Sequence, residues 1–320
     1  MKEKVVVICG PTASGKTALS IELAKRINGE IVSADSMQIY KDMDIGTAKP
    51  TIDEMKGIKH YLLDFVSPEE RYSVAQYKQD AKISIKEIIA KGKTPIIVGG
   101  TGLYVDSLIY EIEYTDIKVD ENYRKELEKI IEEKGLKELY KKAMVIDEVA
   151  MKKISPNDKK RIMRVLEIYK ATGKTKTQQE KESRKNPVEY DYRIFAINWD
   201  REILYERINE RVDKMIEQGL IDEVKNILKK YDKFPTAMQG LGYKEVVDYI
   251  NGIYTKEEMI EKIKMETRRY AKRQLTWFRK NKQTIWLDGK NDLQNNIDII
   301  LEGMNWKRIV IKKKNLTKKE

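Results

Sequence analysis

The chain has 320 residues, which is long enough for one large domain or for a core that carries a smaller unit. Its only cysteine and its only histidine are Cys9 and His60, so an intramolecular disulfide, a cysteine-rich metal site and a Ser-His-Asp triad are effectively excluded. The formal net charge of +11 is typical of proteins that bind a polyanion, although a lysine-rich proteome would also produce it.

No apolar run in the sequence reaches the roughly 18 residues that a helix needs to cross a bilayer. The N-terminus leads almost directly into a predicted strand and leaves no room for a signal peptide. We therefore expect a cytoplasmic protein with no membrane partner.

A phosphate-binding loop is predicted near the start of the chain. Apolar, β-favouring residues 5–8 lead into Gly10, and Gly15, Lys16 and Thr17 open a helical pattern, which matches G-x-x-x-x-G-K-[ST] between a strand and a helix. Glycine lets such a loop approach phosphate oxygens, and the helix N-terminus attracts anions. Lys16 is expected to reach the terminal phosphates, and the Thr17 hydroxyl to hold Mg²⁺. The residues predicted to bind a diphosphate or nucleotide are Gly10, Pro11, Thr12, Ala13, Ser14, Gly15, Lys16 and Thr17.

Strands and helices alternate through the following part of the chain. Short strands are predicted over residues 31–34, 60–65 and 95–98, with an amphipathic helix over 74–90. This alternation predicts an α/β fold, a P-loop NTPase-like parallel sheet flanked by helices. Ligands of such sheets lie beyond the carboxyl ends of the strands. The polar segments expected to converge there are residues 10–17, Asp35 with Ser36, and residues 99–102.

The composition of the sequence changes at about Lys118, where charged segments with a helical pattern replace the alternation of strands and helices. Helices are predicted over residues 121–134, 136–143 and 158–172, a polar loop over 175–187, a strand over 192–198 and one long helix over 202–230. The simplest account is a P-loop catalytic core of residues 1–117 and 189–310 that is interrupted by a helical insertion, residues 118–188. A lysine-rich tail, residues 311–320, follows the core.

A strongly basic helix is predicted over residues 255–282. Between residues 262 and 282 the chain has nine Lys or Arg residues and a single acid, Glu266. Arg268, Lys272 and Arg279 share one face, and a merely solvated face usually mixes both signs of charge. We therefore expect this face to contact a phosphate backbone. The residues expected to pack on the core are Ile260, Ile263, Thr267, Tyr270 and Trp277.

Three side chains have roles that the sequence alone leaves open. Asp35, beside the phosphate loop, could hold Mg²⁺ through water, accept a proton, or cap a helix. Arg207 and Arg211 share one face of the predicted long helix. Either could stabilise a leaving group, or both could form surface pairs with neighbouring glutamates.

The order of motifs along the chain resembles that of the bacterial tRNA dimethylallyltransferases, also called tRNA isopentenyltransferases. The similarity covers nearly the whole chain, and the C-terminal zinc finger of eukaryotic relatives is absent. The segments that carry it are residues 10–17 (GPTASGKT), 33–40 (SADSMQIY), 44–50 (DIGTAKP), 99–104 (GGTGLY), 156–158 with Arg161 and Arg164, 219–220 with 223–224, and 271–277 (AKRQLTW).

The resemblance implies that a dimethylallyl group is transferred from dimethylallyl diphosphate to N6 of adenosine 37, beside the anticodon of tRNAs that read codons beginning with U. It implies that Asp35 accepts the proton of the adenine amine and that Thr101 bonds the oxygen between C1 and the diphosphate. Lys16 and Arg211 would then neutralise the departing pyrophosphate, and Thr17 would hold Mg²⁺. The resemblance also favours a monomer.

The target base must leave the anticodon stack to reach such a pocket. The resemblance implies that Ser36, Met37 and Gln38 line its path, beside Asp35 and Thr101. The basic side chains expected to bind tRNA are Arg124, Lys160, Arg161 and Arg164 of the insertion, with Arg268, Lys272 and Arg279 of the C-terminal helix.

Two alternatives compete with this interpretation. A small-molecule P-loop kinase would share the loop and the strand-end aspartate, but it needs neither the insertion nor the basic face. A nucleic-acid-binding NTPase would need an apolar strand that ends in acids, and residues 143–146 before Asp147 and Glu148 are the nearest candidate. That segment lies within the helical insertion, which argues against it.

Overall fold

A computed structural model describes residues 2–114 and 120–304 of the chain. The core of the larger unit is a six-stranded sheet in the order β3-β2-β4-β1-β5-β6, and every neighbouring pair is parallel. Residues 5–9 of the central strand β1 are fully buried, as expected of a strand covered on both faces. The strands are β1 (Lys4–Cys9), β2 (Gly29–Ser33), β3 (His60–Tyr61), β4 (Thr94–Gly99), β5 (Asp191–Asn198) and β6 (Ile285–Asp288). The predicted parallel α/β sheet is confirmed.

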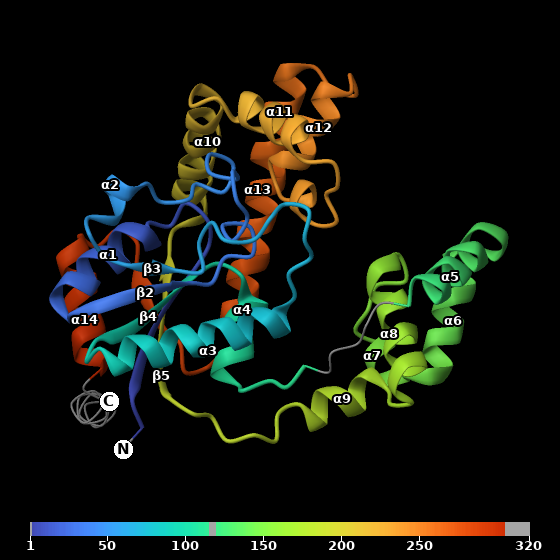
Figure 1. The fold of residues 1–320 in the computed structure, drawn as a ribbon, viewed down its shortest axis with the longest axis horizontal. Helices are drawn as coiled ribbons and strands as arrows, with labels where there is room; N and C mark the ends of the chain where they lie inside the picture. The colour runs from blue at the N-terminus through green and yellow to red at the C-terminus, as the bar shows by residue number, and fades with distance from the viewer. Residues whose placement is uncertain (1, 115–119, 305–320) are drawn as a thin grey trace, which may run out of the picture. The chain divides into compact units, whose positions relative to one another are not determined.

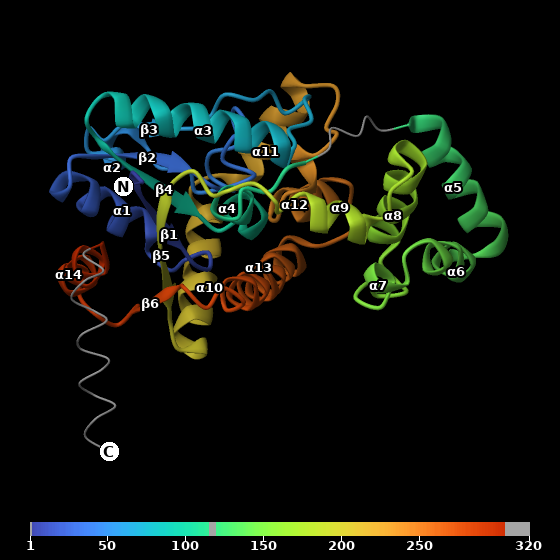
Figure 2. The same cartoon turned by 90° about the horizontal axis from the view of Figure 1, so that it is seen from below.

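Helices cover both faces of this sheet (Figures 1 and 2). The helix α3 (Val74–Ala90) lies on one face, and α1 (Lys16–Arg26) and α14 (Leu293–Met304) lie on the other. The helix α4 (Gly102–Ile109) packs against α3, where the rings of Tyr77 and Tyr104 stack with centroids 3.9 Å apart. Because β1, β2 and β4 are parallel, the segments that follow them begin at the same edge of the sheet.

A second helical group belongs to the same unit (Figure 1). It contains α10 (Arg201–Glu217), α11 (Leu220–Lys230), α12 (Tyr243–Ile250) and α13 (Lys256–Phe278). These helices share one hydrophobic core with Ile39, Tyr40 and Met43, which follow β2 in the chain. The segment after β2 is thus fixed by side chains from the C-terminal third of the sequence. Short helices α2 (Ile52–Met55) and η1 (Ala237–Gln239) complete the unit.

Three sequence-based boundaries were wrong. The strand expected over 60–65 stops at Tyr61, because Leu62 and Asp64 adopt positive φ angles of 60° and 57° that end the extended conformation. The helix expected over 202–230 is two helices, because Gly219 turns left-handed with φ 99° between α10 and α11. The basic helix α13 ends at Phe278, before the expected Lys282.

The smaller compact unit spans Tyr110–Val188, so it begins before the expected residue 118 and ends at the expected residue 188. Its described part has a hydrophobic core that includes Leu127, Leu139 and Ile162. Residues 143–146 belong to a helix of this unit, not to a strand, which removes the acidic strand of the NTPase alternative. Its helices are α5 (Glu121–Lys134), α6 (Leu136–Ile146), α7 (Glu148–Met151), α8 (Lys159–Thr172) and α9 (Lys176–Glu182).

The polar loop expected over residues 175–187 contains the helix α9, so that prediction was also wrong. The Thr175 hydroxyl caps the helix by accepting a hydrogen bond from the Gln178 N–H. In turn, the side-chain oxygen of Gln178 accepts a hydrogen bond from the Thr175 N–H. The Asp147 carboxylate also accepts hydrogen bonds from the N–H and the hydroxyl of Thr177. These capping bonds stabilise a helix whose sequence has no apolar face. The predicted basic tail, residues 311–320, lies outside the described residues.

Within the described residues, no helix is both long enough and apolar enough to span a bilayer.

Candidate active site at the ends of the parallel strands

The phosphate loop lies between β1 and α1, as the sequence predicts. Gly10 has φ 144°, and a Cβ atom there would lie 3.1 Å from the Ile197 carbonyl oxygen, so a side chain would be strained. Gly15 adopts the left-handed conformation at the start of α1, with φ 92°. The loop therefore ends in the unpaired N–H groups of a helix N-terminus, the backbone arrangement that binds phosphate oxygens.

Side chains from distant parts of the chain hold this loop through its backbone. The Trp199 indole N–H donates to the Ser14 carbonyl oxygen at 3.1 Å, and Arg207 Nε donates to the Ala13 carbonyl oxygen at 2.9 Å. The Arg207 guanidinium also lies over the Trp199 ring, 4.5 Å from its centroid. Arg207 thus supports the backbone of the loop, a role that the sequence did not indicate.

Lys16 and Arg211 place two positive charges at the loop. Lys16 Nζ donates to the Pro11 carbonyl oxygen at 2.6 Å. Burial of its ammonium, followed by repulsion from Arg211, lowers the pKa of Lys16 to about 8, and attraction to Asp35 opposes the shift. Burial likewise lowers the pKa of Arg211, again against the attraction of Asp35. A dianionic or trianionic ligand would relieve the repulsion between the two cations.

Asp35 follows β2 and faces these cations. Its Oδ1 accepts hydrogen bonds from the N–H groups of Met37 at 2.9 Å and Gln38 at 3.4 Å. Both bonds go to one carboxylate oxygen, so Oδ2 takes no part in this turn cap. The structure therefore gives Asp35 a capping role through one of its two carboxylate oxygens.

Thr101 joins the end of β4 to the end of β2. Its Oγ1 accepts a hydrogen bond from the Ser36 N–H at 3.0 Å and donates to the Ser36 hydroxyl at 3.3 Å. The two strand ends approach closely, since a Cβ atom on Gly99 would lie 2.1 Å from the Ala34 carbonyl oxygen. The structure thus places Thr101 beside Ser36, which lies 65 residues earlier in the chain, next to the turn that Asp35 caps.

The helix α13 contributes polar side chains that the sequence analysis missed. Gln274 is buried; its Nε2 donates to the Gly100 carbonyl oxygen and its Oε1 accepts from the Thr12 N–H, both at 2.9 Å. Gln274 therefore bridges the phosphate loop and the loop after β4. Gln274 lies in the segment 271–277 that carries the family resemblance, and it follows Tyr270 by four residues, where an amphipathic helix would place a core residue, but neither signal assigns it these bonds.

Tyr270 and Trp277, expected to pack in the core, are partly buried at this site instead. Burial and the negative charge of Asp35 raise the pKa of Tyr270 to about 12, and its hydroxyl contacts the Thr101 and Gln274 side chains. Trp277 Nε1 donates to Asp106 Oδ2 of α4 at 2.9 Å. The face of α13 that looks apolar by spacing is in part a wall of the site.

The basic side chains predicted to bind RNA have mixed surroundings. On α13, Arg268 donates to Asn209 Oδ1 at 2.6 Å and is partly buried, whereas Lys272 is exposed. Arg279, next to the end of α13, is exposed and donates to Asn198 Oδ1 at 3.4 Å.

Within the smaller unit, the predicted basic residues lie on or beside α5 and α8. Arg124 pairs with the buried carboxylate of Glu167 at 2.8 Å, and Arg164 lies 3.5 Å from the same carboxylate. Arg161 pairs with Asp158 at 3.3 Å, and Lys160 is exposed. Removing Arg124 would leave the buried Glu167 carboxylate without this partner, so Arg124 contributes to the stability of the smaller unit.

The parallel sheet, the phosphate-loop motif after β1 and the paired cations beside a strand-end carboxylate are those of a P-loop NTPase-like fold. Residues 38–281 match the family model described as IPP transferase. The chain belongs to this family.

Similar proteins support this assignment over most of the chain. A tRNA dimethylallyltransferase of Acetivibrio thermocellus is 52% identical over 299 residues, which cover 93% of this chain and 95% of the relative. The crystal structure of the full-length tRNA isopentenylpyrophosphate transferase of Bacillus halodurans is 43% identical, with a TM-score of 0.71 over 97% of this chain and 99% of that one. A eukaryotic dimethylallyltransferase acting on tRNA is 32% identical, with a TM-score of 0.74 over 91% of this chain and 75% of that one.

Proposed function

We propose that this enzyme transfers the dimethylallyl group of dimethylallyl diphosphate to N6 of adenosine 37, beside the anticodon of tRNAs that read codons beginning with U. The products are N6-isopentenyladenosine and pyrophosphate. Membership of the IPP transferase family supports the reaction class. The observation that carries the assignment of roles is the meeting of Lys16, Arg211 and Asp35 beside the phosphate loop. We further propose that the chain acts in the cytoplasm as a monomer.

The phosphate loop serves a leaving group in this reaction. The adenine nitrogen attacks C1 of the allyl group, the bond between C1 and its oxygen breaks, and the electron pair departs with pyrophosphate. Allylic carbon tolerates developing positive charge, so stabilising the departing anion contributes most of the catalysis. Lys16 and Arg211 supply this stabilisation, together with the N–H groups of the loop.

Asp35 acts on the attacking nitrogen, and Thr101 acts on the oxygen that leaves with pyrophosphate. The Asp35 carboxylate accepts the proton that the adenine amine loses as it attacks, while its Oδ1 holds the turn after β2. When the substrate binds, the Thr101 hydroxyl turns its single hydrogen from the Ser36 hydroxyl to the oxygen between C1 and the diphosphate. The hydrogen bond that it accepts from the Ser36 N–H and its contact with Tyr270 support its orientation.

Magnesium fits this site with few protein ligands. Within the described residues there is no cluster of three or more His, Cys, Asp or Glu side chains that could hold a metal ion. Mg²⁺ often takes one or two protein oxygens and fills its remaining positions with phosphates and water. The exposed Thr17, at the start of α1, offers one such oxygen beside the diphosphate site. The bound ion would neutralise part of the negative charge of the diphosphate.

A direct assay tests the proposed function. The protein is incubated with Mg²⁺ and labelled dimethylallyl diphosphate, with or without unmodified tRNA, and with ATP in parallel. Label should appear on tRNA only when both substrates are present. ATP consumption without tRNA would favour a small-molecule kinase, and the absence of label on tRNA would overturn the proposed transfer.

Thr101→Ala should lower kcat more than it raises KM for the diphosphate. Loss of one hydrogen bond to a charge that develops only in the transition state is expected to cost about tenfold in kcat. Steady-state kinetics with saturating tRNA measure both constants. A raised KM with unchanged kcat would mean that Thr101 binds only the ground state.

Neutralising Arg268 and Lys272 should weaken tRNA binding and flatten its dependence on salt. Each lost phosphate contact reduces the slope of log K against log salt by about 1. Binding of tRNA is measured across a series of salt concentrations. Lys272→Gln alone is the cleaner variant, because Arg268 also bonds Asn209. An unchanged slope would show that this face is only solvated.

A further inference from the structure

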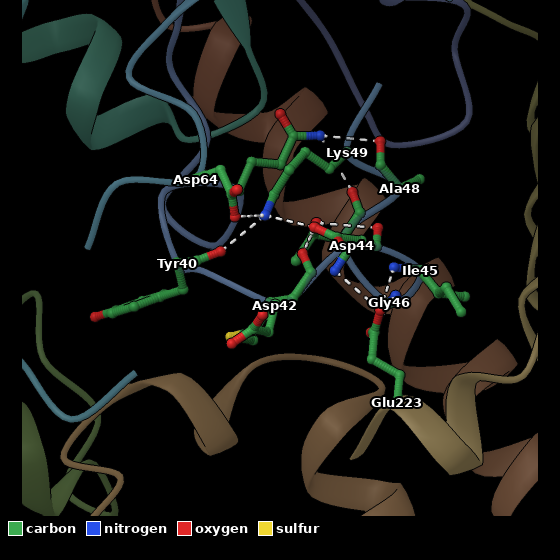
Figure 3. Close-up of polar contacts among 12 residues, drawn as sticks. Tyr40, Asp42, Asp44, Ile45, Gly46, Ala48, Lys49, Asp64 and Glu223 are labelled. Carbon is green, nitrogen blue, oxygen red and sulfur yellow. Dashed lines mark hydrogen bonds and ion pairs between the residues drawn. The ribbon is translucent and has the colours of Figure 1, made fainter. Parts of the chain in front are cut away.

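The segment of residues 44–48, after β2, is held by a carboxylate from a distant helix. Glu223 of α11 accepts hydrogen bonds from three consecutive backbone N–H groups, those of Asp44 at 3.0 Å, Ile45 at 2.6 Å and Gly46 at 3.1 Å (Figure 3). A carboxylate that accepts several N–H bonds holds a loop more strongly than a neutral acceptor does. The path of this segment therefore depends on one side chain about 180 residues later in the chain.

Two further contacts make the arrangement at Glu223 specific. The Tyr243 hydroxyl of α12 donates to Glu223 Oε1 at 2.6 Å. The Tyr243 ring lies directly against Gly46, where a Cβ atom would come within 2.5 Å of the ring. Burial and the charge of Glu223 raise the pKa of Tyr243 well above its usual value, so it stays a neutral donor. The carboxylate is thus fixed by its own helix, by a phenol and by the backbone that it holds.

The other end of the segment is anchored by Lys49. Its side chain is only 7% exposed, and its ammonium lies 2.6 Å from Asp44 Oδ1 and 2.6 Å from Asp64 Oδ1. It also donates to the Tyr40 carbonyl oxygen at 2.8 Å (Figure 3). Charged groups therefore hold the segment at its start, through Glu223, and at the residue that follows its end, Lys49.

The last two residues of this segment carry the carbonyl acceptors for Arg211 and Gln38. Arg211 Nη2 donates to the Thr47 carbonyl oxygen at 3.4 Å. Gln38 Nε2 donates to the carbonyl oxygens of Thr47 at 3.2 Å and Ala48 at 3.1 Å. The three residues whose N–H groups Glu223 holds thus directly precede the two residues whose carbonyl groups accept from Arg211 and Gln38.

We propose that Glu223 is a positioning residue for catalysis, which sets the guanidinium of Arg211 against the diphosphate through the segment 44–48. Glu223 itself touches no substrate. The inference rests on the proposed role of Arg211 at the leaving group. Because misplacement of a catalytic group by about 1 Å can cost up to about 100-fold in rate, the loss of this support should be measurable.

Glu223→Gln tests the proposal, because it keeps the size of the side chain and replaces one acceptor oxygen by an NH₂ group that opposes the backbone N–H donors. We expect kcat for prenyl transfer to fall about tenfold, with a parallel loss of affinity for pyrophosphate. Glu245→Gln is the matched control. Glu245 is a buried carboxylate of the neighbouring helix that accepts from the Gly242 N–H and not from the N–H groups of the segment 44–48, and Glu245→Gln should leave both readouts close to wild type.

A double-mutant cycle separates positioning from general stability. In an Arg211→Ala background, Glu223→Gln should change kcat and pyrophosphate affinity by less than about twofold, because the group that it positions is already gone. Independent effects that multiply would overturn the proposal. If Glu223→Gln does not fold, Glu223→Asp keeps the charge but withdraws the acceptors by one methylene, and the same cycle applies to it.

The pyrophosphate measurement keeps two failures apart. If wild-type protein transfers no prenyl group to tRNA, the proposed function fails, and the coupling of Glu223 with Arg211 can still be read from pyrophosphate binding. If wild-type protein transfers the group but the cycle shows no coupling, the positioning role fails and the proposed function stands.

Discussion

Asp35→Asn should abolish prenyl transfer while tRNA affinity stays within a few-fold of wild type. An exocyclic adenine amine is a poor nucleophile, and a positioned base is worth about 10²–10⁴-fold in rate. The amide keeps an oxygen that can accept the Met37 and Gln38 N–H bonds, so the turn after β2 should persist. Single-turnover transfer to saturating tRNA measures the rate, and a separate binding assay measures the affinity.

Asp35→Ala provides the comparison for the capping role. It removes both the base and the acceptor of the turn, so it should lose as much activity as Asp35→Asn and some stability besides, about 1 kcal/mol for a lost cap. If Asp35→Asn kept near-normal activity and only Asp35→Ala were impaired, the carboxylate would be a structural cap and not the base. An equal collapse of tRNA binding in both variants would point to the same conclusion.

The sequence predicts the sheet and the phosphate loop well, because both depend on local patterns. Apolar residues 5–8 mark a buried central strand, and glycine at positions 10 and 15 with Lys16 marks the loop and the helix start. The break at Gly219 was missed since the amphipathic spacing continues on both sides of it, and only the left-handed φ reveals two helices. The helix α9 was missed because capping groups, not an apolar face, stabilise it.

The sequence predicts several residues of the site but not the long-range hydrogen bonds that join them. The placement of Asp35 and Thr101 at strand ends follows from sheet topology. The bonds of Gln274 to the Thr12 N–H and the Gly100 carbonyl join segments more than 170 residues away, and no local pattern indicates them. The same holds for Glu223, whose carboxylate would be taken for a solvated group on an amphipathic helix. Long-range hydrogen bonds to backbone leave no trace in spacing or composition.

Lys16→Met should lower kcat/KM for the diphosphate by about 10²–10³, the loss typical of removing a preorganised group that stabilises developing negative charge. Lys25→Met is the matched control. It removes the same kind of charge from the same helix, but Lys25 is exposed and pairs with Glu22, so its loss should leave kcat/KM unchanged. Comparable losses in both variants would indicate a general electrostatic effect on anion binding.

The pH dependence of the wild-type enzyme gives an independent test of Lys16. Its pKa is lowered to about 8 in the free protein, so the charged form is present below pH 8 and is lost as the pH rises through 8. Therefore log kcat/KM, which reports the free enzyme, should decline above about pH 8. In the complex the diphosphate favours the ammonium, so the decline in kcat should move to higher pH. Lys16→Arg keeps a permanent charge and should remove the decline from whatever activity remains, whereas a decline that persists in Lys16→Arg would assign the titration to another group.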